Sequence, residues 1–388
     1  MQEREPELDR AGMSATADRI ALRLTTALRG DGWPIWTPAD PAHNRNAVWD
    51  RAAGSHWAAA FAVGAAWLIS LRSPPEAAHA RSAMRSLPVP PSEVTGFSAF
   101  VSWFGAGIGS SLSRDPEAGT GTVTAARALQ ATARPDTAIL AVDAETARPG
   151  ESLRVYIDAV GPTISLFAEA ARIEGDRRLL DLAVEHGLWS LSALRRPDGS
   201  MSQVITLDTG SGEIIDVRTG DQGLAVESTW SRSQAWGLLA AATGAARCPQ
   251  RADEFLPHAH AIAEYWIGRC RTTESWLPRW DFDAETGPID TSAAAITATA
   301  LLRLAAVVAP RSPDRATRYQ RVAEHTLSQL CQHVTPTGPN DRRPAGMLVD
   351  GCYHYPNRLA VIDELVWGDY YLLEACLTAL GELDPLRL

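Results

Sequence analysis

The sequence predicts an all-α protein in which helical hairpins close into one ring, an α/α toroid. Units of helix, short breaker and second helix recur at intervals of about 60 to 70 residues, a period typical of arrays and closed rings. Strand signals are few, and no low-complexity linker separates the units. We therefore expect residues 1–388 to form a single domain, with residues 1–15 as a flexible N-terminal tail.

The helical stretches are bounded by Pro, Gly and capping residues. One such boundary is Gly175 followed by Asp176, which predicts the end of one helix and the cap of the next. The predicted stretches run over residues 55–73, 162–175, 176–195, 230–247, 251–269 and 291–308, and after Pro313 up to His333. A ring of inner and outer helices is expected to place the loops after each inner helix around one central pocket.

Within these stretches the apolar residues follow the helical period. Ile164, Phe167, Ala168 and Ala171 stand at i, i+3, i+4 and i+7. The best strand signals are residues 202–207 and 214–217, which are joined by a polar turn. They predict a small β-hairpin inserted between helices.

Composition excludes several classes of function. The chain has 36 basic and 46 acidic residues, a net charge of −10, which argues against a nucleic-acid partner. Every basic residue is Arg, so chemistry that needs a lysine amine, such as a Schiff base, is excluded. We expect a small-molecule substrate, sugar-like or anionic, and the sequence does not indicate an oligomeric state.

No cofactor or metal is predicted. The five Cys residues are widely spaced without a C-x-x-C pair, and Asp281, Asp283 and Asp290 lack a regular calcium-ligand spacing. The first residues are polar and acidic, and no uninterrupted apolar run reaches about 18 residues. The sequence therefore predicts a cytoplasmic protein without a membrane span.

Several motifs, in order along nearly the whole chain, resemble the unsaturated glucuronyl hydrolase family, glycoside hydrolase family 88. The motifs are Tyr156–Asp158, Arg196–Ser200, Ser228–Gly237, Trp280–Asp283, Asp290–Ala295, Gly351–Pro356 and Trp367–Glu374. The resemblance implies an (α/α)6 barrel, the six-hairpin glycosidase toroid, in agreement with the hairpin period. It also implies hydration of the 4,5 double bond of an unsaturated uronic acid, with one Asp as acid and then base.

Asp158 matches the catalytic acid of this family. Such an acid must keep its proton near neutral pH, which an apolar environment favours by penalising the carboxylate. Tyr156, Ile157, Ala159 and Val160 provide apolar or amphipathic neighbours, and Pro162 is expected to open the next helix. The alternative is that Asp158 merely caps that helix, as Asp does well.

Aromatic and polar residues are predicted to bind the substrate. Arg offers a planar fork of donors for a carboxylate, and Trp a flat face for a sugar ring. The alternatives are that Trp230 and Trp236 are core residues, that Arg232 is engaged in an ion pair, that Gln222 is an exposed amide and that His354 is structural. The candidates are Trp57, Gln222, Arg232, Gln234, Trp236, Tyr353 and His354.

The chain departs from the family at three polar positions. The family has a His-Asp-x-Gly-Phe segment that supplies a second pocket aspartate, and we align it with residues 104–108, so that Gly105 marks its loss. Gln203 and Asp221 replace two His residues. The leading hypothesis is therefore a family enzyme with a diverged substrate. The alternatives are a specialised-metabolism hydratase, lyase or cyclase on the same scaffold, and a catalytically silent sugar-binding protein.

Overall fold

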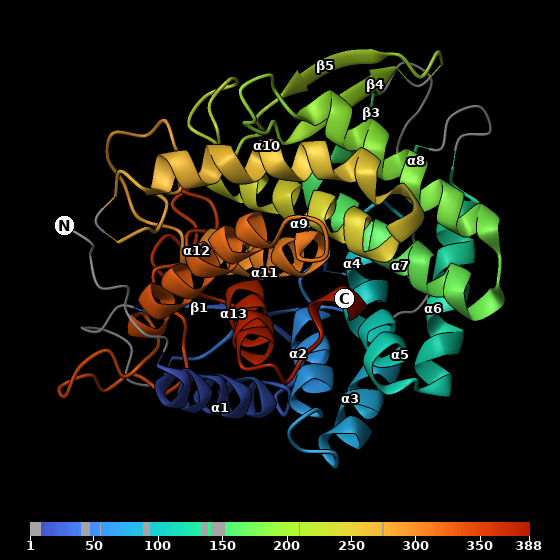
Figure 1. The fold of residues 1–388 in the computed structure, drawn as a ribbon. Helices are drawn as coiled ribbons and strands as arrows, with labels where there is room; N and C mark the ends of the chain where they lie inside the picture. The colour runs from blue at the N-terminus through green and yellow to red at the C-terminus, as the bar shows by residue number, and fades with distance from the viewer. Residues whose placement is uncertain are drawn as a thin grey trace.

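The protein is an (α/α)6 barrel, as predicted. The computed structural model describes residues 9–39, 47–54, 56–87, 94–133, 139–140, 152–208, 210–273 and 275–388. An inner ring of helices closes through successive contacts and is wrapped by an outer ring (Figure 1). The inner segments are α2 (Phe61–Ile69), the continuous run α4 (Ser98–Ser102), η1 (Trp103–Gly107) and α5 (Ile108–Ser113), α7 (Ile157–Glu174), α9 (Ser231–Arg247), α11 (Thr291–Val308) and α13 (Val366–Ala379).

Each inner segment has one outer partner, and the last hairpin joins the two ends of the chain. Figure 1 shows α1 beside α13, and the two helices are in contact. The outer helices are α1 (Arg10–Ala27), α3 (Glu76–Arg85), α6 (Pro116–Gln130), α8 (Arg177–Leu194), α10 (Ala252–Cys270) and α12 (Pro313–Gln332). Short 3₁₀ turns, η2 (Pro249–Arg251) and η3 (Pro385–Arg387), complete the helical structure of the described residues.

The two rings differ in their sequence pattern. Every residue of α2 is buried, and α11 is buried over almost its whole length because it is rich in Ala and carries only one charged residue, Arg303. The outer helix α12 buries one face only, including Tyr319, Leu327 and Leu330. A helix that is apolar all round belongs in a core, whereas an amphipathic one covers it.

Most predicted helices are confirmed, with small differences in their bounds. Asp176 caps α8 by accepting from the Arg178 N–H at 2.9 Å. The prediction for α7 was wrong at its start, because the helix begins at Ile157 and contains Pro162 in its interior. The predicted stretch from residue 55 begins later, as α2, and Ser55 itself lies outside the described residues.

The predicted β-hairpin is confirmed, and two further pairings extend the strand content. β4 (Val204–Asp208) pairs with β5 (Ile214–Arg218), and β3 (Ser152–Tyr156) adds to the other edge of β4. A second sheet joins β1 (Trp33–Thr37) to β2 (Asp50–Ala52) and to the distant β6 (Glu364–Leu365). The strand β3 leads directly into α7 and so fixes the position of Asp158.

The prediction of a flexible tail over residues 1–15 was wrong for its second part. α1 starts at Arg10 with Asp9 as its cap, and Met13 is buried in the core. Residues 1–8 lie outside the described residues. By length and hydropathy alone α11 could cross a membrane, but 89% of its residues are buried inside the protein, which is typical of a core helix.

Candidate active site

A cavity of about 280 Å³ lies at the end of the barrel where the inner helices begin. Trp57 and Phe97 precede α2 and α4, Asp158 and Arg232 are the second residues of α7 and α9, and Tyr353 lies in the loop before α13. The other lining residues are Tyr156, Gln203, Asp221, Gln222, Trp230, Trp236 and His354. The expectation that the loops after the inner helices form the pocket was therefore wrong: the segments before them do.

Asp158 is not a helix cap. The N-cap position of α7 is occupied by Tyr156, which makes no side-chain cap bond, and Asp158 lies inside the first turn. Its Oδ2 atom is buried without a hydrogen-bond partner among the described residues. Desolvation raises the pKa of Asp158 to about 6, although its own backbone N–H, the charge of Arg232 and a hydrogen bond from Gln203 each lower it.

The interior proline of α7 explains why sequence reasoning placed Asp158 in a loop. Pro162 has no N–H, so the Asp158 carbonyl lacks the usual donor four residues further on. The helix continues through this position, and the Thr163 hydroxyl donates to the Ala159 carbonyl at 2.7 Å. Proline in the helix interior normally argues for a break, so the pattern indicated a later start.

The guanidinium of Arg232 is already occupied by protein groups. It donates to Asp290 Oδ2 at 3.0 Å and to the carbonyls of Cys352 and Tyr353 at 2.5 and 2.6 Å. Its carbon atom lies 4.5 Å from the ring centroid of Trp230. The prediction that Arg232 binds a substrate carboxylate with free N–H groups is not supported. These contacts agree with the alternative, in which Arg232 is engaged in an ion pair.

Aromatic side chains form much of the cavity wall. The Trp57 ring lies 6.3 Å from that of Tyr353 and 4.9 Å from that of Trp367 in the core. Trp236 contacts Phe100 edge to face with centroids 5.8 Å apart. Such packing fixes flat surfaces around the cavity, which suits the stacking of a sugar ring.

Polar groups lie at the cavity together with these aromatic rings. Gln222 donates to the Tyr353 carbonyl at 2.9 Å and accepts from Gln203 at 3.1 Å. His354 Nε2 lies 3.7 Å from Asp221 Oδ2 at the mouth. The amide of Gln222 is therefore engaged within the wall, and the alternative of a free loop amide does not apply.

Gln234 does not line the cavity. The side chain is fully buried, and its amide donates to the carbonyls of Gly199 and Ile262 at 2.9 and 3.0 Å. These bonds tie α9 to its outer partner α10 and to the turn that follows α8. The prediction of Gln234 as a substrate-binding residue is corrected accordingly, because an amide that points between two outer elements cannot reach the pocket.

Gly105 does not occupy a pocket position either. It lies in η1, and a Cβ atom there would meet Leu87 Cδ1 at 3.0 Å, on the outer side of the inner ring. Phe97, by contrast, lines the cavity.

The sequence prediction missed Phe97, Gln203, Asp221 and Trp230 as cavity residues, and it favoured a core position for Trp230. Gln203 and Asp221 were noticed only as departures from the family. No sequence signal singled out Phe97. Tyr156, by contrast, was recognised within a motif but was not assigned to the pocket.

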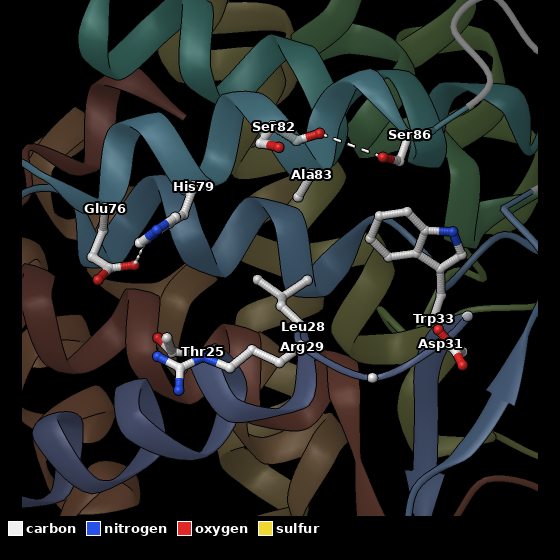
Figure 2. A pocket seen from close by; sticks show the side chains of 12 residues that line it. Thr25, Leu28, Arg29, Asp31, Trp33, Glu76, His79, Ser82, Ala83 and Ser86 are labelled. Atoms are coloured by element: carbon white, nitrogen blue, oxygen red, sulfur yellow. Dashed lines mark hydrogen bonds and ion pairs between the residues drawn. The ribbon is translucent and has the colours of Figure 1, made fainter.

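A larger hollow, of about 500 Å³, lies on the outer surface between the end of α1 and α3 (Figure 2). Its side chains are mostly exposed, and two of them pair with each other, His79 with Glu76 at 2.9 Å. It shares no lining residue with the cavity at Asp158. We therefore place the active site in the smaller cavity. Among the described residues no three His, Cys, Asp or Glu side chains gather as a metal site.

Comparison with known proteins identifies close relatives in sequence and structure. The chain is 30% identical over 269 residues to the unsaturated glucuronyl hydrolase of Bacillus sp. (strain GL1), with 69% of each protein covered. The crystal structure of the enzyme of that strain, described as responsible for degradation of glycosaminoglycan, matches with a TM-score of 0.78 and 25% identity over 94% of this chain and 95% of that chain.

A second solved structure, which carries the sugar chain dGlcA-Glc-Rha-Glc, matches with a TM-score of 0.79 and 26% identity. The match covers 95% of this chain and 96% of that chain. No protein-family model matches the sequence. The structural likeness extends over nearly the whole chain.

Proposed function

The chain belongs to the unsaturated glucuronyl hydrolase family of glycoside hydrolase-type enzymes, and from this premise we propose that it hydrates the double bond of an unsaturated uronide. The relatives named above point to fragments of glycosaminoglycans, which lyases leave with a 4,5 double bond in the terminal sugar. Such a bond is a vinyl ether, because C5 carries the ring oxygen. A small sugar-like ligand fits a cavity of about 280 Å³.

In the proposed reaction the Asp158 carboxyl group donates its proton to C4. Positive charge then develops at C5, where the ring oxygen stabilises it, and water adds there while the Asp158 carboxylate accepts a proton from that water. The resulting hemiketal opens and releases the partner sugar. One water molecule is consumed, and Asp158 ends in its starting protonation state.

The observation that carries this proposal is the state of Asp158. Its Oδ2 is buried at the cavity without a partner among the described residues, and burial raises its pKa to about 6. A carboxyl group of this kind is protonated to a useful extent near neutral pH and is a correspondingly good acid. The aromatic walls supply the apolar surroundings that keep it so.

A second candidate function is hydration or rearrangement of another electron-rich alkene, outside polysaccharide breakdown. The resemblance implies a second pocket aspartate that we do not find in the sequence, and Gln203 and Asp221 stand where it implies two histidines. The contacts of Arg232 also favour this second candidate. Its guanidinium is bound to protein groups and offers no free charge to a uronic carboxylate. The acid is retained in this alternative, while the groups that recognise the usual substrate differ.

Turnover of unsaturated disaccharides in deuterated water tests both candidates. Decay of the ultraviolet alkene band of an unsaturated chondroitin disaccharide measures hydration, and mass spectrometry should find one deuterium in the product at C4. Asp158→Asn is expected to lower turnover by two or more orders of magnitude. Asp176→Asn, which alters a helix cap on the outer ring, is the matched control and should retain turnover.

The results of these experiments distinguish the two proposed reactions from a protein that only binds its ligand. Rapid decay of the band with deuterium at C4 supports the uronide reaction, and slow decay with deuterium gain in another alkene favours the second candidate. If Asp158→Asn retains turnover, Asp158 is not the acid. If no alkene gains deuterium in the presence of the protein, a silent binding protein is the better account.

A further inference from the structure

Two amide side chains, Gln203 and Gln222, form a chain of hydrogen bonds across the cavity wall. The Tyr353 carbonyl can only accept, so the Gln222 Nε2 group must face it, at 2.9 Å. Gln222 Oε1 therefore faces Gln203, whose Nε2 donates to it at 3.1 Å. One carbonyl thus fixes the orientation of both amides. The second N–H of Gln203 Nε2 is left for another acceptor, and Gln203 Oε1 is buried without a partner among the described residues.

The backbone of Gln203 is held beside the start of α7. Its N–H donates to the Arg218 carbonyl at 3.0 Å, and its carbonyl accepts from the Ile157 N–H at 2.9 Å. Ile157 directly precedes Asp158. The Gln203 side chain, which is 3% exposed, consequently has little freedom. It lines the same cavity as Asp158 and lowers the pKa of that carboxyl group.

Gly220 provides the space that this arrangement needs. A Cβ atom at Gly220 would lie 2.0 Å from Gln203 Oε1, far closer than real contacts allow. Gly220 does not have a positive φ, so the backbone itself would accept alanine. The glycine is therefore required for the position of the amide rather than for the conformation of the turn.

We infer that Gln203 is the positioning residue of Asp158, a fixed N–H donor that holds the carboxyl group in the cavity, and that Gly220 keeps this donor in place. The inference rests on the proposed function, since it assigns Asp158 as the acid. A donor to the carboxylate stabilises the charged form that remains after proton transfer to the substrate. It also restricts the carboxyl group to one orientation.

Other charged groups act on Asp158 and must stay unchanged in a test. Arg232 faces it from α9, with Asp290 behind that guanidinium, and Asp221 and His354 lie at the mouth of the cavity. Gln203→Leu removes the donor and leaves all four groups in place. Gln203→His keeps an N–H donor at the same position.

The pKa of Asp158 can be measured without turnover, by carbon-13 NMR of labelled Asp carboxyl groups with the signal assigned from Asp158→Asn. Gln203→Leu is expected to raise this pKa by about one unit, since the lost hydrogen bond favoured the charged form. The alkaline limb of kcat should move upward by the same amount. Gln203→His should keep the pKa below that of the leucine variant.

Gly220→Ala tests the second half of the inference, with Gly338→Ala as its control. A Cβ at Gly338 meets nothing within 4 Å, and its φ is not positive. Gly220→Ala should raise the pKa of Asp158 in the direction of Gln203→Leu, whereas Gly338→Ala should leave it at the wild-type value.

An unchanged pKa of Asp158 in folded Gln203→Leu overturns the positioning role, and an unchanged value in Gly220→Ala overturns the role of the glycine. Should the leucine variant fail to fold, Gly220→Ala decides alone. Failure of the wild type to hydrate any unsaturated uronide would count against the proposed function, while the NMR titration would still judge the role of Gln203.

Discussion

At the scale of single residues, the chemistry depends on which of two opposing effects controls Asp158. Arg232 is a nearby cation and favours the carboxylate, whereas burial favours the neutral acid. Burial has the larger effect, because Arg232 is bound to Asp290 at 3.0 Å and is itself neutralised. Arg232 therefore lies near the site without lowering the pKa of Asp158 so far that the carboxyl group loses its proton.

This balance predicts the pH dependence of the wild type. The pKa of Asp158 is raised to about 6, and the active form is the protonated acid. We expect kcat to be level below about pH 6 and to fall about tenfold per pH unit well above it. A pH–rate profile for the hydration step measures this limb, and a limb near pH 4 would contradict the assignment.

The raised pKa has a consequence for stability with a defined sign. Since the folded pKa lies above the unfolded value, the unfolded state releases its proton first as the pH rises. Asp158 therefore contributes stability below about pH 4 that is lost progressively up to about pH 6. Asp158→Asn should remove this part of the pH dependence, so its melting temperature at pH 8 should equal or exceed that of the wild type.

At the scale of secondary-structure elements, sequence reasoning succeeded where signals were local. The bounds of α11 and the pairing of β4 with β5 follow from periodicity and from Pro, Gly and Asp residues near their ends. The sheet that joins β1 to β6 could not be predicted, because its strands are short and lie more than 300 residues apart. Pro162 misled the prediction because tertiary packing overrides a local helix-breaking preference.

Prediction of the site also succeeded only where the sequence signal was local. Motif matching found Asp158 and Trp236 at the cavity, because they lie within the recognisable motifs Tyr156–Asp158 and Ser228–Gly237. It could not show that the Arg232 fork is filled by Asp290 and two backbone carbonyls, since those partners come from distant segments. The error at Gln234 has the same origin.

Arg232 ties the first turn of α9 to α11, and this predicts a structural effect of its removal. Arg232→Met would leave the buried carboxylate of Asp290 without its cation, at a cost of about 3–5 kcal/mol in the free energy of unfolding. Urea denaturation measures this. Arg318→Met, which removes a surface ion pair, should change stability by about 1 kcal/mol or less.

The double variant Arg232→Met with Asp290→Asn should recover part of the loss, because no unpaired charge then remains buried. If Arg232→Met instead raised KM and left the unfolding free energy unchanged, Arg232 would act on the substrate and not on the fold. A loss of unfolding free energy indicates a structural role for Arg232, whereas a raised KM with unchanged stability indicates a role in substrate binding.

At the scale of the whole molecule, the ring is closed by the two ends of the chain. α1 packs against α13, and Arg23 on α1 pairs with the fully buried Glu364 at 2.7 Å. Arg10 donates to the carbonyls of Ala379 and Leu380 at 3.1 and 2.7 Å. The first helix is therefore part of the barrel wall, although sequence reasoning assigned its first turns to a tail.

This closure predicts that a residue near the start of the chain is as important for stability as one in the central hairpins. Leu24 is fully buried, whereas Leu22, on the same helix, is 70% exposed. Leu24→Ala should cost about 2–5 kcal/mol of unfolding free energy in urea, because it opens a cavity in the core. Leu22→Ala should stay within about 0.5 kcal/mol of the wild type, since it removes only surface contacts. Equal effects of the two substitutions would mean that α1 is only loosely attached. The expected contrast, with kcat unchanged in both folded variants, would show that α1 supports the barrel and not the chemistry at its opposite wall.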